Sequence, residues 1–273
     1  MKKALRIARL ELNTLFYSPI AWLLLIVLLV QLGIVYTTTM SEMEQAKQLY
    51  GGSFGFLTGQ IFSGSSLSLL PSVLEKLYLY IPLITMGLMS REFSSGTIKL
   101  LYSSPIKVRE IVFGKFMAMF TSLSAVTWVP CLVLFAYQAY SSQQPWAAAN
   151  LPIAGGVFAG AVIWIAFLSI LGLAISSWVK WRVVATGAIF AAIFVPAGVG
   201  AIVSAVLRTQ WGFLLNLPVT MSILWQRLLG TPAFMRSAAS LPTSAIVTVL
   251  VLACLLCVAM LNARIRAREV IRG

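Results

Sequence analysis

The sequence predicts an all-α, polytopic membrane protein in which residues 1–273 form a single transmembrane domain. Hydrophobic residues make up 60% of the chain, charged residues make up only 10%, and the mean hydropathy is +0.93. Soluble proteins carry about 25% charged residues, so a fold in water could not cover this much apolar surface. Long uncharged stretches recur along the chain, and in lipid they favour helices, which satisfy their own backbone hydrogen bonds.

Residues 1–17 are the first predicted element, an amphipathic helix that lies in the membrane interface before Ser18-Pro19 turns the chain into the bilayer. Its apolar positions recur at helical spacing: Leu5, Ala8, Leu12 and Leu15. Its opposite face is basic and polar: Lys2, Arg6, Arg9 and Asn13. Because cations on such a helix face lipid headgroups, Lys2, Arg6 and Arg9 are predicted to hold an interfacial elbow. The pattern fits a simple anchor and a lever that rides on a moving partner equally well.

Six membrane spans are predicted from apolar runs of about 20 residues each. The second is the weakest because Glu75 and Lys76 lie near its outer end, and the segment 141–152 separates the third from the fourth. Pro196 and several glycines are expected to bend the fifth. The predicted spans are, approximately, residues 20–36, 69–89, 112–138, 152–178, 183–207 and 241–261.

Lys and Arg residues distribute unevenly between the two sides of this arrangement. With six spans and an inner N-terminus, 15 of the 20 Lys and Arg residues lie in cytoplasmic segments and 5 lie outside. Cytoplasmic loops attract Lys and Arg, so both termini are predicted to be cytoplasmic. A seventh span at the uncharged segment 211–226 would weaken this bias to 11 against 9. Residues 208–240 are therefore predicted to be an outer loop with a short or re-entrant helix.

Composition also excludes several functions. His and Asp are absent, which removes the usual metal ligands and most acid–base groups, so neither a metal site nor an intramembrane enzyme is predicted. Cys131, Cys254 and Cys257 lie in apolar runs and are interpreted as small hydrophobic residues rather than a redox pair. The net charge of +13 is explained by orientation and headgroup attraction. No nucleic-acid partner is therefore predicted.

The longest polar interruption, REFSSGTIKLLYSSPIKVREIVFGK (91–115), carries five cations and two carboxylates. In residues 91–101 the apolar positions and Thr97 recur at helical spacing, which predicts a short amphipathic cytoplasmic helix that ends before Pro105. A second helix is expected to restart after Pro105 and to continue into the third span. Such a pair of helices can transmit a mechanical displacement to the adjoining spans. The alternative is an ordinary charged cytoplasmic loop with no such role.

This segment resembles the first cytoplasmic loop of type-2 ABC exporter permeases. The shared positions are Glu92, Gly96-Thr97, Leu100-Leu101, Pro105 and Gly114-Lys115. Residues 8–22 and 81–93 are also similar to that family, especially to its gliding-motility-associated branch. The resemblance covers roughly the first 120 residues in sequence and is only topological beyond them.

The resemblance implies that residues 91–105 are a coupling helix that docks in a groove of a separate ATPase subunit. The implied coupling residues are Glu92, Phe93, Gly96, Thr97, Leu100, Leu101 and Pro105. Lys99 departs from the family, whose members often carry Glu there, so a charge contact with the ATPase would be altered or reversed. The chain has no phosphate-binding loop of the G-x-x-x-x-G-K-[ST] type. No catalytic residue and no directly bound cofactor are therefore expected, and ATP and Mg²⁺ would bind to the partner.

The implied complex lies in the cell (inner) membrane and contains two permeases, as a homodimer or heterodimer, and two ATPase subunits. Membrane lipids are further partners, and an accessory extracytoplasmic protein is left open. The alternative function is a secondary transporter that works without an ATPase, but such folds are built from two related halves, and no internal repeat is evident. The sequence leaves open which substrate is moved, or whether mechanical work is the output.

Overall fold

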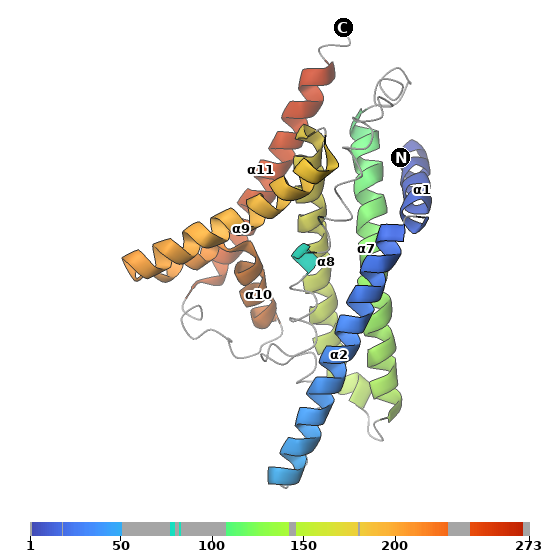
Figure 1. Ribbon diagram of the computed structural model, residues 1–273, viewed down its shortest axis with the longest axis vertical. Coiled ribbons are helices and arrows are strands. Elements are labelled where there is room, and N and C mark those ends of the chain that lie inside the picture. Colours follow the sequence, from blue (N-terminus) through green and yellow to red (C-terminus); the bar gives the residue numbers. More distant parts are fainter. Residues whose placement is uncertain are drawn as a thin grey trace.

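The computed structural model is helical throughout the part of the chain that it describes (Figure 1). It describes residues 2–17, 19–50, 77–79, 82, 108–141, 146–179, 181–228 and 241–269. The helices within these ranges are α1 (Lys2–Phe16), α2 (Pro19–Tyr50), α7 (Val108–Ser141), α8 (Trp146–Trp178), α9 (Arg182–Leu207), the 3₁₀ helix η1 (Gln210–Leu215), α10 (Leu217–Leu228) and α11 (Thr243–Glu269).

Four helices of the described part are long and apolar enough to cross a membrane. Their apolar stretches are Arg109–Val129, Phe158–Trp178, Val183–Leu207 and Thr243–Arg264. Helix α2 adds a shorter apolar stretch, Leu25–Thr38. The predicted all-α class is therefore confirmed for the described residues, and these apolar stretches fit a multi-pass arrangement. The predicted second span, 69–89, lies almost wholly outside the described residues.

Helix α8 is the centre of the molecule. Within the chain, 61% of its apolar stretch is buried, against 17% for each of the α9 and α11 stretches. Trp164, Ile165 and Leu168 are almost completely buried in the shared core, and α8 contacts α7, α9, α10 and α11. Helices α9 and α11 therefore leave most of their apolar surface for lipid or for another protein.

The start of α1 and the end of α11 lie at the same end of the molecule (Figure 1). The start of α7 and the end of α8 lie at that end as well. The Arg264 guanidinium of α11 lies over the Trp178 ring of α8, 5.2 Å from the ring centroid, and this cation–π contact joins the ends of the two helices.

The segment 211–226, predicted as a short or re-entrant helix, forms most of η1 and α10. Their lengths of 6 and 12 residues are well below the about 20 residues that a helical span needs. Helix α10 is buried on several sides, and none of its described side chains is exposed. A Cβ atom at Gly160 of α8 would lie only 2.7 Å from the Trp225 indole. Gly160 therefore makes room for a tryptophan between α8 and α10.

Helix α9 and η1 approach each other at two glycines. A Cβ atom at Gly200 would collide with the backbone oxygen of Gly212, and a Cβ atom at Gly212 would collide with that of Gly200. Arg208, in the left-handed conformation with φ of 48°, ends α9 and starts the reversal. Only residues without a side chain fit such a backbone contact.

We expect Gly200→Ala to lower the free energy of unfolding by about 1–3 kcal/mol, because the added methyl group overpacks this contact. Gly198→Ala is the matched control on the same helix, since nothing lies within 4 Å of a Cβ atom at Gly198. Thermal unfolding of the purified chain in detergent compares the two variants. Equal stability of the two would contradict the close approach of α9 to η1.

Candidate functional site

The predicted coupling residues lie outside the described residues, which resume at Val108, three residues after Pro105. The residues concerned are Glu92, Phe93, Gly96, Thr97, Leu100, Leu101 and Pro105. The structure does describe the helix that follows this loop, α7, and the surface on which α7 meets α1. That junction is the candidate functional site.

Small residues bring α1 and α7 close together. Ala4 and Ala8 of α1 and Ile111 and Ala118 of α7 are buried. A Cβ atom at Gly114 would lie 2.8 Å from the Ala4 backbone oxygen and 3.0 Å from the Ile7 side chain. Gly114 therefore lets the backbone of α1 rest directly on α7.

An ion pair lies beside this contact. The Lys115 ammonium of α7 donates a hydrogen bond to Oε1 of Glu11 of α1. The Lys115 side chain is 1% exposed and the Glu11 side chain is 20% exposed. Burial of a cation is costly unless a carboxylate compensates its charge. Helix α1 therefore supplies the carboxylate that allows the Lys115 side chain to be buried between α1 and α7.

The face of α1 that packs on α7 overlaps the predicted apolar face only in part: Leu15 lines a cavity together with residues of α7, and Leu12 is half-buried. Ala8 belongs to both faces, but Leu5 is 63% exposed, and Glu11 takes part in the contact. The Arg6 and Arg9 side chains are exposed, and the Lys2 side chain lies outside the described part. Sequence analysis named Lys115 as a position shared with the permease family but missed Glu11 and the pairing of the two side chains. The available signal was a lone carboxylate three residues after Ala8, on the small-residue side of the helix.

The corner between α1 and α2 is fastened by aromatic residues. The Trp22 indole N–H of α2 donates a hydrogen bond of 2.6 Å to the backbone oxygen of Phe16, and the two rings pack edge to face with centroids 6.3 Å apart. A small cavity of about 40 Å³ at this corner is lined by residues of α1, α2 and α7: Leu15, Phe16, Trp22, Leu25, Ser122 and Val126. Helices α1, α2 and α7 therefore meet at this corner.

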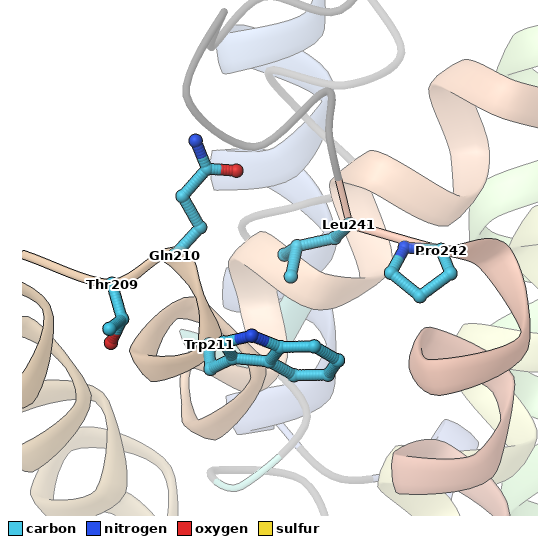
Figure 2. A pocket seen from close by; sticks show the side chains of 5 residues that line it. All are labelled: Thr209, Gln210, Trp211, Leu241 and Pro242. Atoms are coloured by element: carbon cyan, nitrogen blue, oxygen red, sulfur yellow. The ribbon is translucent and has the colours of Figure 1, made fainter.

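A larger pocket of about 230 Å³ lies between η1 and the start of α11 (Figure 2). Its lining residues are Thr209, Gln210, Trp211, Leu241 and Pro242. In Figure 2 the Trp211 indole lies beneath Leu241, while the Gln210 amide points away from the ring. Nearby, Arg227 donates hydrogen bonds to Thr243 Oγ1, at 2.6 Å, and to the backbone oxygen of Leu241. No lining residue is ionisable, so the pocket offers packing and hydrogen bonds but no acid–base group.

The described residues offer no cluster of three His, Cys, Asp or Glu side chains that could hold a metal ion. Cys254 and Cys257, within the apolar stretch of α11, are free thiols in the described structure. Cys257 is buried and packs in the shared core.

Comparison with known protein families matches nearly the whole chain. The family described as ABC-2 family transporter protein matches residues 5–263. No curated protein matches the chain in sequence. Members of this family are non-catalytic membrane subunits that work with a separate ATPase. The match spans most of α1, residues 91–115 and nearly all of the four long apolar stretches. The chain therefore belongs to the ABC-2 transporter family, as the membrane-spanning permease component of an ABC transporter.

Proposed function

We propose that the partner ATPase docks on residues 91–105 and works the permease by moving α7. The observation that carries this proposal is that α7 begins at Val108 and runs without a break to Ser141, over 34 residues. At 1.5 Å per residue such a helix is about 50 Å long. A displacement of the loop would therefore be passed along one continuous helix, whose first 22 residues, Val108 to Val129, precede the single proline of α7, Pro130.

The seven predicted coupling residues would contribute to docking in different ways. Phe93, Leu100 and Leu101 would supply the apolar face that enters a groove of the ATPase, as amphipathic helices do in helix-in-groove recognition. Glu92 would add a charge contact at the start of the helix. Gly96 and Thr97 complete the family pattern, and Pro105 ends the helix. Lys99 would favour a carboxylate on the ATPase.

The proposed arrangement has six spans with both termini in the cytoplasm. The start of α1 and the end of α11 lie at the same end of the structure (Figure 1), which supports this arrangement. The positive charges at this end of the molecule also support a cytoplasmic location. The side chains of Arg6 and Arg9 on α1 and of Arg109 at the start of α7 are exposed, and Lys and Arg are enriched in cytoplasmic segments.

We expect a reporter fused after Gly273 to be active only when the reporter is a cytoplasmic type. The reason is that the arginine-rich tail resists transfer across the membrane. Paired fusions measure this: alkaline phosphatase, which needs the outer side, and a fluorescent protein that matures in the cytoplasm. A tail with phosphatase activity and no fluorescence would contradict the six-span arrangement.

The proposed complex is an exporter of two permeases and two ATPases in the inner membrane. ATP and Mg²⁺ would bind to the ATPases, with lipid and an accessory extracytoplasmic protein as further partners. Residues 8–22 and 81–93 support placement in the gliding-motility-associated branch. The apolar surfaces of the permease suit an amphipathic or lipid-linked substrate, or mechanical work as the output.

Affinity purification from native membranes tests this function. A tagged permease should retain an ATPase subunit that carries a phosphate-binding loop, and the isolated complex should hydrolyse ATP. The matched control is a chain with the charge reversal Glu92→Lys, which should retain less ATPase. A wild-type chain that purifies from gently solubilised membranes with no ATPase would contradict the proposal.

A further inference from the structure

We propose that α1 transmits the movement of α7 to α2 through two contacts. The Glu11–Lys115 ion pair joins α7 to α1, and the Trp22–Phe16 hydrogen bond joins α1 to α2. The inference rests on the proposed function, because it takes α7 as the helix that the ATPase moves. It assigns Glu11 and Lys115 a role as positioning residues, distinct from the coupling residues of the loop.

The first contact, the Glu11–Lys115 ion pair, joins α7 to α1. Lys115 lies seven residues after Val108, the first described residue of α7, so it is close to the point where the loop would deliver its displacement. The side chain is 1% exposed, and its ammonium is hydrogen-bonded to Glu11. Any shift of this part of α7 must either carry Glu11 with it or separate a buried ion pair.

The second contact, the Trp22–Phe16 hydrogen bond, joins α1 to α2. Trp22 donates its indole N–H to the Phe16 backbone oxygen at 2.6 Å, across the turn that follows α1. Among the described helices, α2 makes its most extensive contacts with α1. Elsewhere α2 reaches the shared core through Leu28, with Tyr36 packed against it. Helix α1 is therefore the helix with which α2 shares most of its described contacts, and α2 also meets α7 at the corner cavity through Leu25.

The ion pair provides something that the surrounding packing does not. The closest α1–α7 contact is made by Ala4, Ala8 and Gly114, and such small residues present a smooth surface along which one helix can slide past the other. A buried ion pair has a single favourable register, and fixing register is the best-attested use of buried polar groups. Glu11 and Lys115 therefore fix the register of α1 on α7.

The test measures helix movement in the permease–ATPase complex, reconstituted in nanodiscs. Cys131, Cys254 and Cys257 are replaced by Ser, and nitroxide labels are attached to exposed positions: Ile34→Cys on α2, Val133→Cys on α7 and Leu256→Cys on α11. Pulsed electron paramagnetic resonance then gives the α2–α11 and α7–α11 distances before and after trapping with ATP and vanadate.

In the otherwise wild-type complex both distances should change by ~2 Å or more, the size of helix shifts in switching proteins. The apolar double variant Glu11→Leu/Lys115→Met should keep the full change in the α7–α11 distance. Its change in the α2–α11 distance should be smaller than that of the wild-type complex by about fivefold or more. The charge exchange Glu11→Lys/Lys115→Glu should restore most of it. Trp22→Phe, which keeps the ring but removes the donor, should also reduce the α2–α11 change. Arg109→Gln, an exposed charge on α7, is the matched control and should alter neither distance.

Two results would overturn the inference while leaving the proposed function standing. The first is an apolar double variant that keeps the full α2–α11 change, because the pair would then have only a packing role. The second is a charge-exchanged variant in which that change stays lost. If the α7–α11 distance does not change in the wild-type complex on ATP trapping, the proposed function is wrong, and the inference that rests on it is wrong as well.

Discussion

Leu100→Asp should release the ATPase from the permease almost completely. In the proposed docking Leu100 is buried in a groove of the ATPase, and a carboxylate there would lose its hydration without gaining a partner. The few residues that dominate an interface cost about 2 kcal/mol or more when they are truncated, and burial of an unpaired charge adds to this cost. A loss of about 3 kcal/mol corresponds to roughly 100-fold weaker binding. Quantitative co-purification from native membranes, with permease and ATPase measured in the same eluate, gives the ratio directly.

The matched control for Leu100→Asp is Ser103→Asp, which adds the same charge within the same loop at a position outside the predicted apolar face. The permease yield and its elution volume show whether each variant still folds. Full retention of the ATPase by the Leu100→Asp chain would mean that residue 100 is not at the docking surface. Equal loss in both variants would mean that added negative charge alone, and not the apolar face, weakens the complex.

Glu11→Leu should destabilise the folded permease more than Lys115→Met does. Lys115 is 1% exposed while Glu11 is 20% exposed, so removal of Glu11 deprives a buried cation of its carboxylate, whereas Glu11 can recover some hydration when Lys115 is removed. Removing one partner of a buried ion pair typically costs about 3–5 kcal/mol. Replacement of both partners by apolar residues of similar size is often nearly neutral, so the double variant should be close to wild type.

Thermal unfolding in one detergent compares these three variants with the wild-type chain. Thr14→Val, at an exposed position of α1, is the control for changes to α1 alone. The order of stability should be Glu11→Leu lowest, Lys115→Met intermediate and the double variant highest. Additive losses in the double variant would contradict the ion pair, since independent sites add and coupled sites do not.

The helical class and several helix ends followed from the placement of charges in the sequence. Helix α9 begins at Arg182 and ends at Leu207, next to the predicted limits of 183 and 207, because charged residues flank this apolar run. Helix α8 ends at Trp178, just before Lys180. Charges mark where a helix can leave lipid, so these boundaries are local properties that a single sequence carries.

The α1–α7 junction could not be predicted in the same way. Glu11 and Lys115 are 104 residues apart in the chain, and the helical pattern of residues 1–17 separates only apolar from polar faces. The side of α1 that contacts α7 shares Ala8 with the predicted apolar face but also includes Ala4 and Glu11. Small residues give little signal in such a pattern, although they are what allows two helices to approach closely.

The position of Trp225 was missed for a related reason. Within 211–226 the sequence indicated a short uncharged helix but not which surface would receive it. Trp225 lies against Gly160, in a helix that is distant in sequence. A space left by a glycine is a property of the assembled core, so the sequence of either segment alone does not reveal it.

Photo-crosslinking from the coupling loop in intact membranes is the most direct test of how this permease is driven. A photoreactive amino acid at position 101, in the predicted apolar face, should form a covalent product with an ATPase subunit, and ATP-vanadate trapping should alter its yield. The same group at exposed Val206, near the end of α9, should form no such product. Crosslinks from position 101 only to lipid or to proteins on the outer side of the membrane would contradict docking of the ATPase on this loop.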